Sequence, residues 1–523
     1  MTFQASRSRV CVQHSAPVRD ADRVAPFGMK TDENGLLPPQ RLGTILRGEL
    51  LPVMCNDRLR SSTPGETFVG AALCQKCAAA GPLQKSGYAA LVLALATTAL
   101  AAAERGEYSS RAAEQQLPRA MHTRMTERPT ITVGLRGADI VGTDNRALQA
   151  AVDYIAGLGG GTVEIGAGEF TMHDSLHLRS QVTVRGTAGK TVLRKAMGAS
   201  SPLAVDGDFG EEQITVVNPE GFAVGYGVAI WDKNSGGFHT TVARITGRRG
   251  NTFSINTPLN ADCMIADNAQ AAIVFPIVSG YNIDGARVEN LIVEGDKPEN
   301  VSLNGCRGAG IFLYRGFGTV IENCVVRAYH GDGISFQQSN DVLVRGCISE
   351  DNAGLGIHPG SGSQRPVVRD CIARRNGEDG LFLCWRVKNG LFEKNVFENN
   401  GRFGISIGHK DTDNLLQDNE VRDNRQDGVF FRNETAGMAG HRNRLENNVI
   451  ENNGSKDGAS GIRVRGETKD LVFRNNVIRD TRPADARKQI VGIRIEEQAG
   501  TVTLEGNQID ATTRIDDRRK SGR

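Results

Sequence analysis

Net charge, aromatic residues and long apolar runs are all scarce in this sequence. Its 62 Lys and Arg residues nearly balance 60 Asp and Glu residues, giving a formal charge of +2 at pH 7. That balance gives no indication of a nucleic-acid partner. Aromatic residues make up only 5% of the chain, whereas glycine occurs 62 times in 523 residues, and this composition suits tight β turns. The apolar segment at 85–103 is too short for a comfortable membrane span, so we expect no stable membrane insertion after processing.

The N-terminal part lacks the periodicity of a folded domain. Residues 1–84 are rich in Arg, Ser and Pro, and we interpret them as an unstructured extension or as sequence upstream of the true start. Residues 85–103 combine a basic flank, a short apolar run and small residues near its end, the pattern of a secretory signal peptide. Acting as a signal, this segment would direct the protein to the periplasm or outside the cell. Otherwise it is an Ala-rich stretch of a cytoplasmic protein, and 104–129 are a linker in either case.

A repeated phrase of glycine followed by alternating apolar residues organises the rest of the chain. Its glycines are spaced 23, 23, 24, 24 and 24 residues apart, at Gly310, Gly333, Gly356, Gly380, Gly404 and Gly428. An asparagine series at Asn352, Asn376, Asn400 and Asn424 keeps the same 24-residue step. A fixed period in the twenties predicts a solenoid of stacked coils, in which each asparagine can bond its equivalent in the next coil.

The content of each repeat indicates which solenoid this is. Apolar residues alternate after each glycine, and short β-rich runs such as 342–344 and 367–368 follow, so no room remains for a helix of ten residues. A coil of about 24 residues with three short strands resembles one rung of the right-handed parallel β-helices, the pectate-lyase-like superfamily. The resemblance covers Thr130–Asp510 and implies an all-β solenoid. The fold alone leaves the function open.

The ends of the solenoid and one interruption can also be predicted. An amphipathic helix around 143–155, stopped by a glycine run, is expected to cap the open N-terminal end of the core. The coil period is lost over 197–276, which predicts a β-rich insertion on one flank that walls a groove. The β-helix is expected to span 130–511, and 512–523 are expected to be a disordered tail.

Cysteines follow the same period and argue against a disulfide framework. Cys324, Cys347 and Cys371 lie 23 and 24 residues apart, so they are expected to stack on neighbouring rungs. Three cysteines stacked on neighbouring rungs cannot all be paired with one another in disulfides. We therefore expect buried free thiols that fill space in the core.

The candidate site lies on the side of the coils that follows the repeated glycines. The second and fourth residues after each glycine are expected to point away from the core, and the bend comes next. An elongated face with basic and aromatic side chains is where a polysaccharide would lie. The candidate catalytic residues are His358, Arg386, His409, Lys410 and Arg432. The candidate substrate-binding residues are Tyr314, Gln337, Trp385, Asp411 and Glu434. Inter-rung salt bridges on an ordinary outer face are the competing interpretation.

A second, partial resemblance concerns His358-Pro359. Mannuronan C5-epimerases, which are also right-handed β-helices, carry an Asp-Pro-His-Glu motif in a comparable coil. Only the histidine of that motif has a counterpart here, at His358, and the catalytic aspartate of the following coil would fall at Cys384. The resemblance implies proton abstraction from a sugar carbon beside a carboxylate.

These residues lead us to expect an enzyme that cleaves an acidic, uronate-containing polysaccharide by lyase-type β-elimination. Such a reaction needs a base, a cation to stabilise the enolate-like anion and an acid for the leaving oxygen. Hydrolysis through Asp411 and Glu434, C5-epimerisation, and carbohydrate binding without catalysis remain the alternatives. Convergence of His358, Arg386, His409 and Arg432 in one pocket beside the insertion would favour an enzyme.

No cofactor is required by this chemistry. Calcium-dependent lyases of the superfamily gather acidic residues on one rung, and only Asp411 and Asp413 come near that pattern here. A calcium requirement is therefore left open. The sequence does not determine an oligomeric state.

Overall fold

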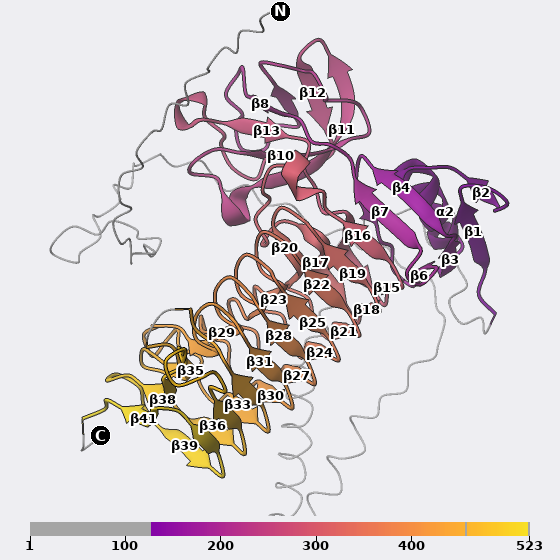
Figure 1. The fold of residues 1–523 in the computed structure, drawn as a ribbon. Coiled ribbons are helices and arrows are strands. Elements are labelled where there is room, and N and C mark those ends of the chain that lie inside the picture. The colour runs from indigo at the N-terminus through magenta and orange to yellow at the C-terminus, as the bar shows by residue number, and fades with distance from the viewer. Residues whose placement is uncertain (1–126, 456–457, 521–523) are drawn as a thin grey trace, which may run out of the picture. The chain divides into compact units, whose positions relative to one another are not determined.

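The computed structural model describes residues 127–455 and 458–520. These residues wind into a solenoid whose rungs each contribute one strand to each of three long parallel sheets (Figure 1). The chain is a right-handed parallel β-helix, as the glycine repeat predicts. The segments 1–84, 85–103 and most of 104–129 lie outside the described residues. Within the described part, no helix is long and apolar enough to cross a membrane.

The first sheet has 13 strands. In spatial order they are β2 (Ile140–Val141), β1 (Thr130–Gly134), β3 (Gly161–Ile165), β6 (Val182–Gly186), β15 (Arg287–Glu289), β18 (Val320–Glu322), β21 (Leu343–Arg345), β24 (Val367–Arg369), β27 (Leu391–Glu393), β30 (Leu415–Gln417), β33 (Arg444–Glu446), β36 (Leu471–Arg474) and β39 (Val502–Glu505).

The second sheet has 11 strands. They are β4 (Gly168–Met172), β7 (Thr191–Lys195), β16 (Ile292–Glu294), β19 (Val325–Arg327), β22 (Ile348–Glu350), β25 (Ile372–Arg374), β28 (Val396–Glu398), β31 (Glu420–Arg422), β34 (Val449–Glu451), β37 (Val477–Arg479) and β40 (Gln508–Asp510).

The third sheet, also of 11 strands, contains the repeated glycine phrases and carries the outer face discussed below. Its strands are β5 (Leu176–His177), β14 (Val278–Asp284), β17 (Ala309–Phe317), β20 (Asp332–Gln337), β23 (Ile357–Gly360), β26 (Leu381–Phe382), β29 (Ile405–Ile407), β32 (Val429–Phe431), β35 (Ser460–Val464), β38 (Val491–Ile495) and β41 (Thr513–Asp517).

The core between the sheets is filled by stacked apolar side chains and closed by a helix. Val344, Val368 and Phe392 occupy equivalent positions on successive rungs of the first sheet and are fully buried. Helix α2 (Asn145–Gly157) lies against β1 and β3 and buries Leu148, among other residues, over the N-terminal end of the core. The side chain of Asp144 caps this helix by accepting a hydrogen bond from the Arg146 amide. Both the cap and the core follow from the sequence pattern.

Buried polar ladders hold neighbouring rungs in register. Each of Asn352, Asn376 and Asn400 donates its side-chain Nδ2–H to the side-chain oxygen of the asparagine one rung further on, at 2.9–3.0 Å. The same Nδ2 group also bonds a backbone carbonyl. The predicted asparagine stack is confirmed. The cysteines that share the period, Cys324, Cys347 and Cys371, are buried and free of disulfides.

The insertion expected at 197–276 forms a sheet of its own. Six antiparallel strands build it, in the order β8 (Ser200–Pro202), β13 (Gln270–Ala272), β10 (Gly227–Trp231), β11 (Thr241–Arg249), β12 (Thr252–Ile255) and β9 (Gln213–Thr215). Three short 3₁₀ turns are η1 (Gly237–His239), η2 (Ile265–Asp267) and η3 (Lys297–Glu299). Because the insertion leaves the solenoid after β7 and returns at β14, it stands beside the first rungs (Figure 1).

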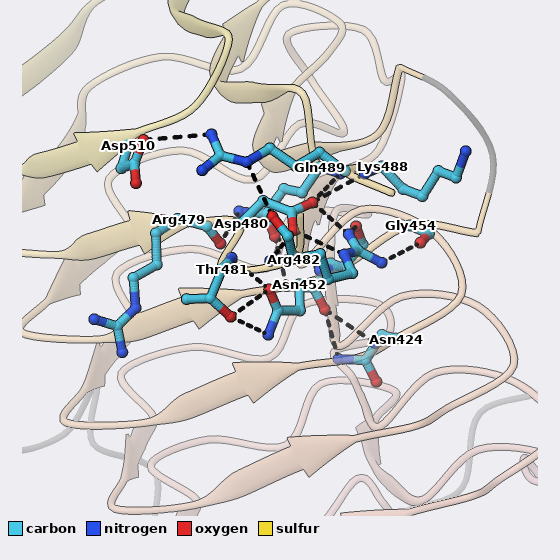
Figure 2. A network of polar contacts seen from close by, with 12 residues as sticks. Asn424, Asn452, Gly454, Arg479, Asp480, Thr481, Arg482, Lys488, Gln489 and Asp510 are labelled. Carbon is cyan, nitrogen blue, oxygen red and sulfur yellow. Dashed lines mark hydrogen bonds and ion pairs between the residues drawn. The ribbon is translucent and has the colours of Figure 1, made fainter. Parts of the chain in front are cut away.

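The C-terminal rungs carry a longer loop, and a strand where we expected disorder. The loop of residues 482–488 is held by Asp480, whose buried carboxylate accepts hydrogen bonds from the Arg482 guanidinium and from the amides of Lys488 and Gln489 (Figure 2). Burial alone would raise the pKa of Asp480, but these donors lower it to about 2. In the segment expected to be a disordered tail, Thr513–Asp517 form β41, which pairs in parallel with β38.

Replacing Asn400 by alanine tests the ladder. The change would remove the side-chain donor to the buried Ala373 carbonyl and the acceptor for one of the two hydrogen bonds that Asn376 Nδ2 donates, so we expect the free energy of unfolding to fall by about 2–4 kcal/mol. Urea denaturation measures this loss. Gln426→Ala, an exposed glutamine near the same ladder, is the control and should change stability by less than about 0.5 kcal/mol. Equal effects of the two variants would contradict the role of the ladder.

Acid sensitivity tests the Asp480 loop. The folded pKa of about 2 lies below the ordinary value of 3.8, so the unfolded chain binds the proton more readily. The stabilisation is therefore fully present above about pH 4 and is lost as the pH falls toward 2. Denaturation of wild type and Asp480→Asn should show a stability difference at pH 5 that shrinks at pH 2. A difference that does not vary with pH would rule out this anchor.

Candidate active site

A cavity of about 200 Å³ lies between the insertion and the first rungs of the third sheet. The solenoid contributes the segment around β5, together with β14, β17 and the loop before β17. The insertion contributes β11 and the segments next to it. Six polar or aromatic side chains in its lining carry chemistry: Asp174, His177, Arg244, Tyr281, Arg307 and Tyr314. The insertion thus walls a site, as its position in the sequence suggested.

Asp174 is the centre of the polar network in this cavity. Its side chain is only 3% exposed, and one carboxylate oxygen accepts hydrogen bonds from His177 Nε2 at 2.9 Å and from Arg244 Nε at 2.5 Å. Burial alone would raise the pKa of Asp174, but the histidine and the arginine outweigh burial and lower it. The carboxylate therefore stays ionised. It ties the insertion to the coil and fixes which ring nitrogen of His177 carries a proton.

The other ring nitrogen of His177 lies against the solenoid. Its Nδ1 atom is 3.2 Å from the Ser279 hydroxyl oxygen. With the Nε2–H donating to Asp174, Nδ1 holds the lone pair and accepts a hydrogen bond from that hydroxyl. His177 and Ser279 are partners in the register of β5 and β14, so the parallel ladder itself brings them together.

Two tyrosines and two arginines complete the lining. The rings of Tyr281 and Tyr314 lie on neighbouring rungs with centroids 6.4 Å apart and are tilted by 42° to each other. Burial raises the pKa of Tyr281 well above its usual range, and nearby Arg307 partly offsets this shift. Tyr281 is therefore protonated at neutral pH. The guanidinium of Arg307 lies over the Tyr314 ring at 5.8 Å. Together with Arg244, it makes the cavity cationic around a single carboxylate.

His358, the predicted base, lies elsewhere and is buried. It is 3% exposed, and its Nδ1 atom is 2.7 Å from Asp332 Oδ2. Burial alone would lower the pKa of His358, but Asp332 and Cys384 outweigh it and raise the pKa to about 10. The imidazole is therefore charged at neutral pH. This arrangement makes His358 half of a buried ion pair.

Arg432, Asp411 and Gln337 form buried contacts of their own. Arg432 donates to the Ser406 hydroxyl, the Leu383 carbonyl and the Asp411 carboxylate at 2.6–3.1 Å. Asp411 is completely buried and also accepts two backbone amides. Burial raises its pKa to about 7 despite Arg432. Gln337 is buried as well and donates to the Ser335 hydroxyl.

The remaining predicted residues lie on the bends of three neighbouring rungs, after β26, β29 and β32. Trp385 stacks on His409 with ring centroids 5.1 Å apart, and His409 Nε2 donates to Glu434 at 2.8 Å. Arg386 and Lys410 follow these two rings and are exposed. Of the ten predicted residues, only Tyr314 lines the cavity. His358, Arg386, His409 and Arg432 do not converge in this pocket beside the insertion.

Most residues of the cavity could not be predicted from the sequence, because they lie outside the glycine repeat. It also placed the second residue after each glycine on an open face, whereas Phe312, Ser335, His358 and Ser406 are buried. The loop before β17 covers part of this row, and the Ser335 hydroxyl bonds the Gly305 carbonyl within that loop. The one available signal was the His-Asp-Ser-Leu-His run at 173–177, next to the point where the coil period fails.

No set of three or more His, Cys, Asp or Glu side chains in the described part of the chain is arranged to hold a metal ion. The cavity contains one such carboxylate and one such imidazole, already bonded to each other. A calcium requirement stays open as a question for the activity assay.

Comparison with known proteins agrees with the fold. The family described as "Right handed beta helix region" matches residues 295–438 and 388–514. Solved structures that resemble the chain include the A-module of a mannuronan C-5 epimerase from Azotobacter vinelandii, with 17% identity over 73% of this chain and 94% of that one and a TM-score of 0.46. No curated protein matches the sequence.

Two further solved structures that resemble the chain are of proteins of other kinds. A polygalacturonase from Erwinia carotovora ssp. carotovora has 13% identity, covers 78% of this chain and 98% of its own, and has a TM-score of 0.48. A surface protein and adhesin from Streptococcus pneumoniae has 13% identity, with coverage of 73% and 98% and a TM-score of 0.46. These likenesses are too distant to say anything of the chemistry of this chain.

Replacing His358 distinguishes a catalytic from a structural role. In His358→Ala, Asp332 would remain as a buried charge without its partner, so we expect a loss of about 3–5 kcal/mol in the free energy of unfolding. Urea denaturation measures this loss. The Asp332→Asn/His358→Gln double variant removes both charges and should recover part of it. An unchanged melt with abolished activity would instead support the catalytic role that the sequence suggested.

Proposed function

We propose that the protein cleaves an acidic, uronate-containing polysaccharide by β-elimination in the cavity beside the insertion. The observation that carries this proposal is the meeting of two arginines, two tyrosines and the Asp174–His177 pair around one cavity. Arginine pairs readily with carboxylates. Tyrosine rings stack on sugar rings, and the tyrosine hydroxyls form hydrogen bonds or donate a proton. The cavity is smaller than the roughly 300–1,000 Å³ typical of drug-sized ligands, so one small unit of a polymer suits it.

The residues supply each part that elimination needs. Arg244 and Arg307 neutralise the uronate carboxylate, which makes the neighbouring C5 proton more acidic. The lone pair at His177 Nδ1 takes this proton, and Asp174 stabilises the resulting imidazolium through Nε2. The electron pair of the C5–H bond forms the C4–C5 double bond while the C4–O bond breaks. Tyr281, whose phenol is protonated at neutral pH, gives its proton to the leaving oxygen.

Elimination fits this cavity better than hydrolysis through two carboxylates. Retaining and inverting glycosidases use a pair of acidic residues across the scissile bond. Asp174 is the sole carboxylate among the described lining residues, and its lowered pKa leaves it without a proton to donate. The alternative pair fits poorly too, because Asp411 is enclosed by backbone amides and Arg432.

Two other functions share the scaffold. Epimerisation begins with the same proton abstraction but returns a proton to C5 without bond cleavage, so a product analysis separates it from elimination. Binding without catalysis would leave the polymer unchanged. Secretion, expected if 85–103 act as a signal, would place the protein where such polymers occur.

The full-length chain should produce unsaturated uronates from one member of a polymer panel. We would incubate it with alginate, pectate, chondroitin, heparan and ulvan-type chains, with and without calcium, and follow the ultraviolet absorbance of the new double bond. Tyr281→Phe and Arg307→Gln should each lower kcat/KM at least about 100-fold, because an acid or a charge-stabilising group is lost.

The matched control for this series is Arg249→Gln, because Arg249 is an exposed arginine on the same strand as Arg244. It should retain full activity. Shorter chains without absorbance would contradict elimination and point to hydrolysis. Full activity of both Tyr281→Phe and Arg307→Gln would show that the reaction does not take place in this cavity.

A further inference from the structure

One residue on each of six consecutive rungs adopts the left-handed backbone conformation at the same place in the third sheet. For the first five of these rungs, the residue before it belongs to one register row, which runs through Tyr281, Tyr314, Gln337, Gly360 and Cys384. The six residues, with φ between 49° and 62°, are Asn282, Arg315, Gln338, Ser361, Trp385 and His409. We call this set the bend column.

The bend column begins in the cavity and ends at an exposed aromatic pair. Asn282 belongs to the cavity lining. Four rungs further on, Trp385 is 38% exposed and stacks on His409 with an interplanar angle of 28°. At the strand spacing of about 4.8 Å, four rungs span roughly 19 Å. Both ends therefore lie on one line along the solenoid axis.

The conformation of these two residues is unusual for their size. Left-handed backbone recurs at the bends of this solenoid, mostly at Asn, Asp and Arg, and Trp385 and His409 are the two aromatic residues in the described part of the chain that adopt it. For a bulky residue this conformation is an outlier that tends to occur at functional sites. Trp385 and His409 are each followed by a second left-handed residue, Arg386 and Lys410. Equivalent residues one rung earlier are Ser361 and Gly362, a small pair suited to the turn. Nothing in the turn itself favours the large side chains.

The aromatic pair is held in place and surrounded by cations. Glu434 accepts a hydrogen bond from His409 Nε2, which fixes the orientation of the ring. Burial, together with nearby Arg432, lowers the pKa of His409 to about 4, so this ring is neutral at neutral pH. The guanidinium of Arg386 lies 5.8 Å from the Trp385 ring. The exposed Lys410 follows His409. A flat aromatic surface with one cation against it and a second exposed cation next in sequence suits a sugar ring that carries a carboxylate.

We propose that Trp385, His409, Arg386 and Lys410 form a distal binding subsite for an acidic polysaccharide, reached along the bend column from the cavity. A sugar ring stacks on the Trp385 indole, and its carboxylate pairs with Arg386 or Lys410. An extended polymer with one unit in the cavity places a unit about four rungs further on over this subsite. The choice of an acidic polysaccharide as ligand rests on the proposed function. The position of the subsite rests on the geometry of the bends.

Tryptophan fluorescence tests this subsite without any turnover. The chain contains two tryptophans, so full-length Trp231→Phe leaves Trp385 as the sole reporter. Long oligogalacturonate and oligoalginate should each be titrated against a neutral glucan oligomer of the same length. We expect one acidic oligomer to change the Trp385 emission, and we expect added salt to weaken that response. A response equal for the neutral glucan, or no response to either acidic oligomer, overturns the subsite.

Variants extend the test to affinity and kinetics. Arg386→Gln should weaken binding of the acidic oligomer at least about fivefold, and Lys190→Gln, an exposed lysine on the N-terminal rungs, should not. With a cleaved polymer, Trp385→Ala should raise KM about tenfold at unchanged kcat, while a disaccharide or trisaccharide is unaffected. Trp385→Phe, which keeps a ring for stacking, should recover most of the affinity.

The two proposals fail in different ways. Oligomer binding at Trp385 with no product from any polymer would leave the subsite standing and refute the elimination. Normal turnover with unchanged KM in Trp385→Ala would refute the subsite and leave the elimination standing. The thermal unfolding midpoint of each variant should lie within a few degrees of the wild-type value, which would show that a loss of binding or activity is not caused by misfolding.

Discussion

The parallel register between rungs is the constraint on which the rest of the structure depends. Backbone hydrogen bonds and the buried asparagine ladders place each residue directly beside the residue one repeat away. Side chains 23 to 33 residues apart in the regular coils, and 102 residues apart across the insertion, therefore become neighbours in space. The pairing of His177 with Ser279, the contact of Tyr281 with Tyr314 and the bend column all follow from this one condition.

The site forms where the repeat is interrupted. A regular solenoid presents an even outer face, and the insertion adds a second wall that turns part of it into a cavity. The contact of Arg244 with Asp174 joins the two parts across 70 positions of the sequence. Asp174 is buried whereas Arg244 is partly exposed, so the loss of the arginine would be costly because it leaves a buried carboxylate with one partner fewer. The same pair therefore fixes the insertion and orients His177.

The sequence predicts the periodic part of this account well and the aperiodic part poorly. Glycine and asparagine spacing was sufficient for the fold, the rungs and the stacked cysteines, because one repeat determines the next. Asp174 and Arg244 share no repeat, and their contact depends on how a whole insertion folds back. His358 seemed exposed because the loop before β17, whose Gly305 carbonyl bonds Ser335 in the same row, lies outside the glycine repeat. Trp385 was predicted from the sequence to bind substrate, and its left-handed backbone became visible only in three dimensions.

The most direct test is a crystal structure of Tyr281→Phe with a long acidic oligosaccharide from the polymer that the protein binds. The account predicts density for one sugar unit in the cavity, with its carboxylate near Arg244 or Arg307. Further units should follow the bend column toward Trp385. Density along the first or second sheet, or across the outer face without entering the cavity, would contradict the central claim that the insertion and the third sheet form the site together.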